Sequence, residues 1–404
     1  YFLGVSVVAG LALLILPQFL SGVSDTAPDP GYILVAFTML WIFGSPVRVL
    51  PSADRNIPWQ AAAITWIAVL RMLTVIATAW LTRDVQYVFV GLLVWSIIQF
   101  GILAYYVGTR FGFAFTLPGR QRMAEQLEYA LPFGMAQLLL GARRKGEQWI
   151  VSFLFMPVGL AVFSIGMSFN VTLTMIRRSV ANVLLPKMSG AHGAGNTDRA
   201  LELNNRGNVV VFAAVAPVIA LLFVYAEPIV HILYTEQYVG AVPILRVYLL
   251  ALAVMSIEFS SVMMVLAQGG FVARINMVSL VVSLTLSYLG ALAFGMTGVA
   301  IGALAGECLT RVLSYLRGSS LLERPISALQ DWDTLGRILG AAVVASITSH
   351  YFGAFVLEHS NRYVSVVVGG VAIATIYVAA LVLFGLGWLV QYFLKRGDWN
   401  EQRG

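Results

Sequence analysis

The chain has 404 residues, of which 59% are hydrophobic and only 11% are charged, and its mean hydropathy is +0.84. Soluble domains carry roughly 25% charged residues, so this composition excludes a water-soluble globule and requires most of the surface to face lipid. The single cysteine, Cys308, excludes an intramolecular disulfide and a cysteine-cluster metal site. The formal net charge of +6 does not indicate a nucleic-acid partner, because the basic residues are sorted between the two sides of the predicted membrane.

Apolar runs of roughly 17–25 residues are long enough to cross the hydrocarbon core of a bilayer, and this chain has about twelve of them. The sequence therefore predicts an all-α integral membrane protein built as a bundle of about twelve transmembrane helices. In chain order, the predicted spans are Tyr1–Leu20, Gly31–Leu50, Gln60–Leu81, Tyr87–Val107, Leu131–Met156, Val158–Leu185, Val209–Tyr225, Leu245–Leu266, Ile275–Phe294, Gly298–Leu316, Ile338–Val356 and Val364–Val390.

The connections between these spans carry an asymmetric distribution of lysine and arginine. If Tyr1 lies on the cytoplasmic side, the outer connections hold only Arg83 and Arg362. Positive charge is retained on the cytoplasmic side during insertion, so this asymmetry supports both the number of spans and the orientation. The cytoplasmic connections hold Arg48, Arg55, Arg110, Arg120, Arg122, Lys187, Arg199, Arg206, Arg274, Arg317, Arg324, Arg337, Lys395, Arg396 and Arg403.

Two cytoplasmic connections are longer than the others. These are Thr109–Ala130 and Lys187–Asn208, and the second contains a short polar helical stretch around Asp198–Asn205. The outer connections are short. A polymerase or ligase that works outside the membrane would need a large outer loop to carry its chemistry, so the short loops disfavour such an enzyme.

The sequence lacks the common signatures of catalytic sites. The phosphate-binding GxxxxGK[ST] loop is absent, as are HExxH, CxxC and GxSxG. The four histidines do not have the spacing of metal ligands. We therefore predict no catalytic residue, no metal site and no cofactor, and expect the protein not to be an enzyme.

A run of cations interrupts the predicted span Leu131–Met156. Arg143, Arg144 and Lys145 are followed by Glu147, and the apolar stretch before them would rise only about 18 Å as a helix. Neither side of the run can cross the bilayer alone, so the cluster must lie near the middle of the membrane. A cation that faces lipid there costs about 2.5–3.5 kcal/mol on the insertion scale, so these side chains must contact water or anions.

Helical periodicity divides this cluster. At 100° per residue, Arg143, Arg144 and Glu147 share one side of the helix, whereas Lys145 points elsewhere. We therefore predict that Arg143 and Arg144 bind an anionic substrate. The alternative is a purely structural Arg143–Glu147 pair that joins helices, and it would leave two further cations unexplained.

Other ionisable residues also lie within predicted spans, where such residues usually face a cavity or a partner. Arg71 has no carboxylate on its own helix, and a structural and a substrate-binding role fit it equally. Glu307 and Arg311 have the i,i+4 spacing of an intrahelical pair. Glu258 lies in the middle of its predicted span without such a partner. Glu258, Glu147 and Glu307 are therefore the candidates for coupling transport to a proton or sodium gradient.

Small residues recur every fourth position in the predicted span Gly298–Leu316. Gly298, Gly302 and Gly306 form a small-xxx-small ladder, which predicts that a neighbouring helix approaches closely along this face.

A series of short motifs runs from Ala130 to Arg317. They are Leu131-Pro132, Gln148-Trp149-Ile150, Val158-Gly159, Phe163-Ser164-Ile165-Gly166, Leu185-Pro186 with Ser189, Pro228-Ile229, Leu233-Tyr234, Tyr238, Pro243, Gln268-Gly269 with Asn276, and Gly295 with Gly298-Val299-Ala300. Together they resemble the polysaccharide-transporter (Wzx-type) branch of the multidrug/oligosaccharidyl-lipid/polysaccharide exporter superfamily. Phe163 departs from the tyrosine that is usual there in that family. The front of the chain, Tyr1–Val107, is compatible with the family in its spacing but carries little of its signature.

The resemblance implies a two-lobed fold around a central cavity. The span at Leu131 would be the seventh helix, so Tyr1 would begin in the third, and the complete protein would have about fourteen helices. The implied domains are an N-terminal lobe at 1–108 lacking its first two helices, a cytoplasmic connection at 109–130, a C-terminal lobe at 131–317, and two additional helices at 338–390.

The same resemblance implies a flippase that works by alternating access. It would move undecaprenyl-pyrophosphate-linked oligosaccharide from the cytoplasmic to the outer leaflet of a bacterial inner membrane, for O-antigen or exopolysaccharide synthesis. A basic cavity fits a pyrophosphate, so Arg71, Arg143 and Arg144 are the expected substrate-binding residues. The implied partners are the lipid-linked oligosaccharide, membrane lipids, and a polysaccharide polymerase with its chain-length machinery.

Three alternatives stay open. A cation-coupled multidrug exporter of the same superfamily would need an anionic cavity for cationic drugs, and the cations at 143–145 argue against it. A lipid II flippase also uses a basic cavity and fits as well. A membrane-embedded glycosyltransferase or polymerase belongs to a different class, and detection of sugar transfer by the purified protein would favour it.

Overall fold

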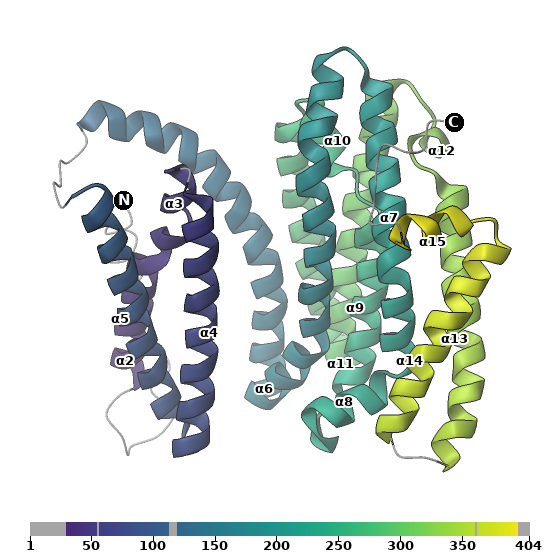
Figure 1. Ribbon diagram of the computed structural model, residues 1–404, viewed down its shortest axis with the longest axis horizontal. Helices are drawn as coiled ribbons and strands as arrows, with labels where there is room; N and C mark the ends of the chain where they lie inside the picture. The colour runs from purple at the N-terminus through teal and green to yellow at the C-terminus, as the bar shows by residue number, and fades with distance from the viewer. Residues whose placement is uncertain (1–29, 55, 113–118, 360–361, 395–404) are drawn as a thin grey trace. The chain divides into compact units, whose positions relative to one another are not determined.

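The computed structural model describes residues 30–54, 56–112, 119–359 and 362–394. The predicted span Tyr1–Leu20 lies outside the described residues. Every regular element in the described residues is a helix (Figure 1), which confirms the predicted all-α fold class. The chain divides into two compact units between Met123 and Ala124.

The described helices differ widely in length. In chain order they are α2 (Pro30–Gly44), η1 (Ser45–Arg48), α3 (Leu50–Ala53), α4 (Ile57–Thr82), α5 (Val85–Arg110), α6 (Arg120–Gly193), α7 (Thr197–Val224), α8 (Ala226–Tyr234), η2 (Glu236–Tyr238), α9 (Ala241–Ser256), α10 (Ser260–Val265), α11 (Gly269–Leu322), α12 (Ile326–Leu329), α13 (Trp332–His359), α14 (Arg362–Leu383) and α15 (Gly387–Leu394).

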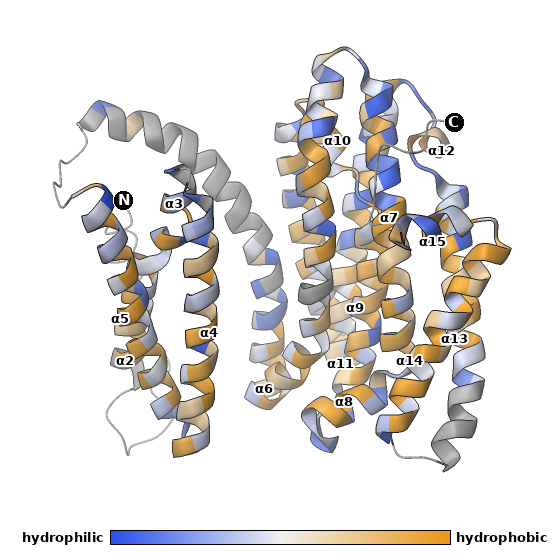
Figure 2. Ribbon diagram, in the orientation of Figure 1, coloured by the Kyte–Doolittle hydropathy of each residue, from blue (hydrophilic) through white to orange (hydrophobic). Residues whose placement is uncertain are grey.

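The described helices carry a surface suited to lipid. Large apolar side chains are exposed on them, among them Trp80 (76%), Phe153 (87%) and Leu383 (83%), and apolar residues dominate the helices in Figure 2. Such extensive apolar exposure identifies a membrane-facing surface, so the protein crosses the membrane several times. Within the described residues, six helical segments are long and apolar enough to do so: Pro58–Thr82, Gln86–Arg110, Gly141–Phe169, Thr197–Val224, Gly269–Leu322 and Arg362–Leu383.

The first unit packs α2, α4 and α5 around a tryptophan. Trp95 of α5 is 1% exposed and packs in one cluster with Val47 and Ile67. Its indole Nε1 donates a hydrogen bond to the carbonyl oxygen of Ile67 at 2.9 Å. Because a buried indole N–H needs a partner, this bond fixes α5 against α4.

The two longest helical segments, α6 and α11, each contain a reversal and form a hairpin of two helices. In α11, Gly295 has a φ of +63°, which glycine adopts without steric cost. Ser287 Oγ on one side of Gly295 donates to the carbonyl of Val299 on the other at 3.0 Å, and Thr310 Oγ1 bonds to Ser279 Oγ at 2.9 Å. Earlier residues therefore meet later ones in reverse order, so the two halves run antiparallel, as the two spans predicted here require.

The same arrangement recurs in α6. Phe155 and Met156 leave the helical conformation, and the side-chain amide of Gln148 contacts Met167 Sδ at 3.3 Å across the reversal. The chain therefore turns back on itself between the predicted spans Leu131–Met156 and Val158–Leu185, and the separation of these two spans is confirmed.

The glycine ladder of α11 packs within this hairpin. The backbone of Gly298 contacts that of Gly290, while Gly302 faces Ser287 and Gly306 faces Ser283. A Cβ atom at any of these glycines would overlap the opposite half of the hairpin. The predicted close approach is confirmed, and the neighbouring helix is the preceding half of α11.

Helix α7 forms the centre of the second unit, and most of its residues from Ala200 to Leu222 are buried. It packs against α9, α13 and α14. Its start is capped by Asn196, whose side-chain oxygen accepts a hydrogen bond from the backbone N–H of Arg199 at 2.9 Å. The predicted helical stretch around Asp198–Asn205 is confirmed, and these residues form the first turns of α7, which continues into the following span.

Two predicted spans are interrupted. The span Leu245–Leu266 divides into α9 and α10 around Glu258, and the span Val364–Val390 divides into α14 and α15. At the second break Gly385 has a φ of +77°, and the N–H of Leu386 bonds to the carbonyl of Leu381 at 2.8 Å. This is a Schellman motif with glycine in the left-handed position, which ends a helix regardless of how apolar the following residues are.

The hairpin of α11 yields a stability prediction. Gly298→Ala places a methyl group against the backbone of Gly290, so we expect a loss of about 1–3 kcal/mol from overpacking. The matched control is Gly336→Ala on α13, because no atom lies within 4 Å of the Cβ it would add. Thermal unfolding in detergent should show a lower midpoint for Gly298→Ala alone. Equal midpoints for both variants would contradict this packing.

Candidate functional site

Three charged side chains meet between α6 and α11. Arg143 Nη2 lies 3.3 Å from Glu307 Oε1, and Arg311 Nη2 lies 3.7 Å from Glu307 Oε2. The side chains of Arg143, Glu307 and Arg311 are 14%, 20% and 13% exposed. This charged triad therefore holds two cations on one carboxylate, largely shielded from the surroundings.

The triad lies deep in its unit. Along α6 the helix rises about 18 Å from Arg143 to the reversal at Phe155, and along α11 it rises about 18 Å from the reversal at Gly295 to Glu307. A hydrocarbon core is about 30 Å thick, so both partners lie near the middle of their spans. The predicted mid-membrane depth of Arg143 agrees with this geometry.

A glycine allows the two helices to meet at this depth. The guanidinium of Arg143 lies over Gly306, 3.1 Å from where a Cβ atom at that position would be. Arg143 Nη2 also donates a hydrogen bond to the carbonyl of Ala303 at 2.9 Å. The ladder on α11 therefore leaves room for Arg143 as well as for the other half of the hairpin.

The structural alternative of an Arg143–Glu147 pair is not what the structure shows. Arg143 pairs with Glu307 on another helix, whereas the 4%-exposed Glu147 accepts a hydrogen bond from the hydroxyl of Tyr248 at 2.7 Å. Tyr248 lies on α9, and its ring meets that of Phe163 edge-on at 5.9 Å. Glu147 thus connects α6 to α9. The predicted Glu307–Arg311 intrahelical pair is confirmed, and it is shared with Arg143.

The two neighbouring cations of the run differ from Arg143. Lys145 is exposed and its ammonium donates to the side-chain carbonyl of Gln148 at 3.1 Å. Arg144 lies on α6, and its side chain is outside the described residues. Its predicted substrate contact therefore stays a prediction.

Arg71 belongs to the first unit. Its side chain is exposed on α4, and its guanidinium carbon lies 5.2 Å from the ring centroid of Trp95. A cation over an indole face gains a modest electrostatic attraction. Since Trp95 is itself fixed by its bond to Ile67, the stacking orients Arg71 without neutralising its charge.

Glu258 lies in the break between α9 and α10. Its backbone carbonyl accepts hydrogen bonds from the side-chain amides of Asn204 and Asn208, at 2.9 and 2.8 Å, and these replace helical bonds lost at the break. Its carboxylate accepts from the backbone N–H of Ser261 at 3.0 Å and from the Ser261 hydroxyl at 2.8 Å. The predicted continuous span Leu245–Leu266 is therefore wrong, because the helix is broken at Glu258, and Ser261 bonds to its carboxylate.

A small cavity adjoins the Glu258 carboxylate. It has a volume of about 20 Å³, and its lining includes Glu258, Asn208, Ser261 and Arg177. That volume suffices for one water molecule. Glu258 is 8% exposed, so this space could admit a water molecule, a proton or a small ion beside it and nothing larger.

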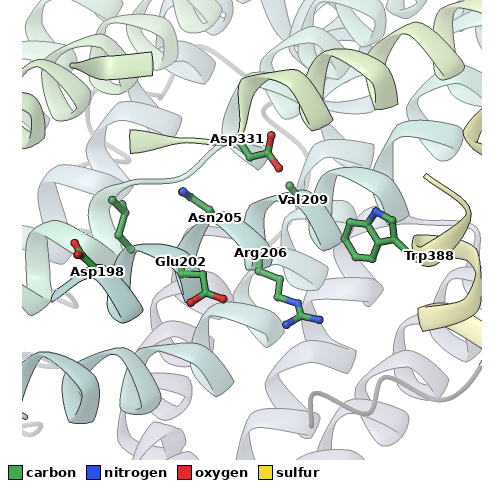
Figure 3. A pocket seen from close by; sticks show the side chains of 8 residues that line it. Asp198, Glu202, Asn205, Arg206, Val209, Asp331 and Trp388 are labelled. Carbon is green, nitrogen blue, oxygen red and sulfur yellow. The ribbon is translucent and has the colours of Figure 1, made fainter. Parts of the chain in front are cut away.

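A larger pocket of about 620 Å³ follows one face of α7 (Figure 3). Two of its acidic residues have cationic partners, since Asp198 pairs with Arg324 at 2.8 Å and Glu202 pairs with Arg199 at 2.6 Å, while Asp331 accepts a hydrogen bond from the backbone N–H of Thr334 at 3.1 Å. The pocket shares no residue with the charged triad, so we do not assign the substrate to it. Its lining comprises Asp198, Leu201, Glu202, Asn205, Arg206, Val209, Asp331 and Trp388.

Sequence reasoning missed two residues of this region. Arg311 was assigned only to an intrahelical pair, and Tyr248 was not singled out. The i,i+4 spacing of Glu307 and Arg311 carried part of the signal, because it places both on the same side of α11. Nothing in the sequence distinguishes Tyr248 from a tyrosine in an ordinary apolar span.

The comparisons with known proteins agree with this architecture. A family model described as "Polysaccharide biosynthesis protein" matches residues 5–243. No curated protein matches the sequence.

Three solved structures illustrate the fold. The structure is similar to the lipid II flippase MurJ in an inward closed conformation, with a TM-score of 0.73, 15% identity, and coverage of 97% of this chain and 82% of that chain. An inward-facing multidrug resistance MATE family transporter of the MOP superfamily gives a TM-score of 0.66 at 17% identity, with 81% and 80% covered. A MOP superfamily transporter from Pyrococcus furiosus gives 0.56 at 17% identity, with 81% and 77% covered.

These structural likenesses show the fold, and the family match covers more than half of the chain. The predicted resemblance is therefore confirmed: the chain belongs to the polysaccharide biosynthesis protein family and has the fold of the MOP superfamily transporters.

Proposed function

We propose that this chain is a flippase that moves an undecaprenyl-pyrophosphate-linked oligosaccharide from the cytoplasmic to the outer leaflet by alternating access. The observation that carries the proposal is Arg143, a 14%-exposed guanidinium near mid-membrane on a chain of the polysaccharide biosynthesis family. A cation at that depth is costly, and such residues mark substrate or ion pathways. An anionic headgroup that has to cross the membrane gives this cation a function.

Guanidinium groups suit a pyrophosphate for a geometric reason. Arginine presents a planar fork of N–H donors that can bind two phosphate oxygens at once, whereas lysine offers a point charge. We assign Arg143 and Arg144 to the headgroup, with Arg71 of the first unit as a further contact. A rigid-body exchange between inward- and outward-open states would carry the bound headgroup across.

The setting follows from the same proposal. The protein would work in a bacterial inner membrane, for O-antigen or exopolysaccharide synthesis, together with a polysaccharide polymerase and its chain-length machinery. It would perform no covalent chemistry. A proton or sodium gradient would drive the cycle, with Glu258, Glu147 and Glu307 as the candidate coupling carboxylates.

A lipid II flippase is the second candidate, because a solved structure bearing that name has the same fold. One experiment separates the two substrates. The gene is deleted in its host, and the lipid-linked sugar that accumulates on the cytoplasmic leaflet is identified. Accumulation of a polysaccharide repeat unit supports the proposal, whereas accumulation of lipid II overturns it.

The role of Arg143 gives a first prediction. Arg143→Ala removes charge-assisted hydrogen bonds to the headgroup, each worth about 1.5–3 kcal/mol, so we expect flipping to fall roughly 10- to 100-fold. Arg143→Lys keeps the charge but loses the fork, so its rate should lie between those of alanine and wild type. Transport of the lipid-linked sugar in reconstituted vesicles measures the effect.

The matched control is Lys145→Gln on the same helix, because Lys145 is exposed and its ammonium bonds to Gln148 on the same helix. It should flip at close to the wild-type rate. Membrane abundance and thermal stability are measured for each variant. A stable Arg143→Ala that flips at the wild-type rate would remove Arg143 from the headgroup site.

The coupling role gives a second prediction. Glu258→Gln keeps an acceptor for Ser261 but cannot exchange a proton, so we expect a several-fold loss of gradient-driven transport with nearly normal protein levels. The control is Glu236→Gln, since Glu236 has a 78%-exposed side chain in a surface ion pair with Arg362. Unchanged transport across pH and sodium concentration would show that Glu258 has no coupling role.

The proposed orientation gives a third prediction. Ser320 lies in the last turn of α11, shortly before α12, and Gln237 follows α8 directly. Figure 1 shows α12 and α8 at opposite ends of the second unit. In a chain with Cys308→Ser, we expect Gln237→Cys to react with an impermeant thiol reagent in intact cells. Ser320→Cys should react only after the inner membrane is opened. The reverse labelling pattern would show that the proposed orientation is wrong.

A further inference from the structure

Arg311 has an unused hydrogen-bond donor at the charged triad. The Arg311 side chain is only 13% exposed, and its buried Nε atom has no hydrogen-bond partner among the described residues. Buried donors are almost always satisfied. The unsatisfied N–H of Arg311 is therefore a donor available to a further acceptor at the triad.

Glu307 satisfies neither guanidinium fully. Its two oxygens lie 3.3 Å from Arg143 and 3.7 Å from Arg311, longer than the roughly 2.7–2.9 Å of a charge-assisted hydrogen bond. One carboxylate also leaves the triad with one positive charge in excess. Glu147 lies one turn from Arg143 on α6, but its carboxylate is buried and bonded to Tyr248.

A phosphate or pyrophosphate would fit the triad better than Glu307 does. It offers more charged oxygens than a carboxylate, and it could reach both guanidinium forks, including the free Nε–H of Arg311. We infer that Arg311 is a further anion-binding residue, and that Glu307 is an internal counter-ion which a phosphate group displaces from Arg143 and Arg311. This inference rests on the proposed function and assigns the residues that hold the headgroup.

The two residues should have opposite effects on anion affinity. The probes are inorganic pyrophosphate and farnesyl pyrophosphate, titrated into the purified full chain in detergent, with the dissociation constant as the readout. Arg311→Gln removes a ligand, so we expect binding about tenfold weaker or more. Glu307→Gln removes the competitor and leaves two uncompensated guanidinium groups, so we expect binding at least about threefold tighter.

Thermal stability separates this role from a purely structural one. Glu307→Gln should lower the unfolding midpoint without ligand, and pyrophosphate should raise it by more than in the wild type, because a ligand stabilises in proportion to its affinity. A structural pair would give a lower midpoint that pyrophosphate does not restore. Arg311→Lys, which keeps the charge, serves if Arg311→Gln does not fold, and it should bind with intermediate affinity.

The matched control is the ion pair of Arg199 and Glu202 on α7, which is more exposed and lies outside the triad. Arg199→Gln and Glu202→Gln make the same changes of charge and should leave both affinities unchanged. Wild-type affinity in Arg311→Gln, or weaker binding in Glu307→Gln, would overturn the inference.

Failure of the proposed function would look different. If the wild-type chain binds neither probe, the flippase proposal falls together with this inference. If it binds both and depends on Arg143 but not on Arg311 or Glu307, only the inference falls. Tighter binding of farnesyl pyrophosphate than of inorganic pyrophosphate supports a lipid-linked source. Equal affinity would overturn that source and leave a site for a free phosphate.

Discussion

A bilayer core supplies no water to hydrogen-bond a peptide group or solvate a charge. The described backbone meets this constraint at the two points where a predicted span is interrupted. At the break around Glu258, the amides of Asn204 and Asn208 bond to the freed carbonyl. At the end of α14, the Schellman bond from Leu386 to Leu381 closes the helix. Irregular backbone is thus found where other groups of the protein supply the missing partners.

A buried charge without a partner costs more free energy than a buried peptide group without one, so the charged side chains also need partners. Arg143 and Arg311 share the carboxylate of Glu307, and Glu147 is bonded to Tyr248. Breaking a buried ion pair strands the remaining charge, whereas the complete pair contributes little net stability because desolvation opposes it. Stability alone therefore gives little reason for a buried triad of this kind. An anion that crosses the membrane would satisfy it in the bound state.

Close packing makes these polar contacts possible. The glycines of α11 bring the two halves of its hairpin into backbone contact, and the gap over Gly306 admits the guanidinium of Arg143. A rigid hairpin holds Glu307 and Arg311 in fixed register with α6. Transport by rigid-body exchange needs such stiff elements, because a binding group that moved freely would not carry its ligand from one side to the other.

The sequence by itself determined what depends on neighbouring residues along the chain. Composition required a membrane protein, run lengths predicted most spans, and the depth of Arg143 within its own run required an anion or water near it. The spacing of Gly298, Gly302 and Gly306 predicted a close helix contact, and that of Glu307 and Arg311 predicted their pair. The two spacing predictions follow from the period of one helix.

Only the tertiary structure decided which residues from different helices meet. Periodicity offered Glu147 as an alternative partner of Arg143, but the structure pairs Arg143 with Glu307, because the α11 hairpin brings that carboxylate to the same depth. Likewise, the run around Glu258 is as apolar as a continuous span. At its break, α7, far away in the sequence, supplies Asn204 and Asn208 as partners for the freed backbone. A polar partner on another helix leaves no local pattern, so the charged triad and the break could be found only from the folded chain.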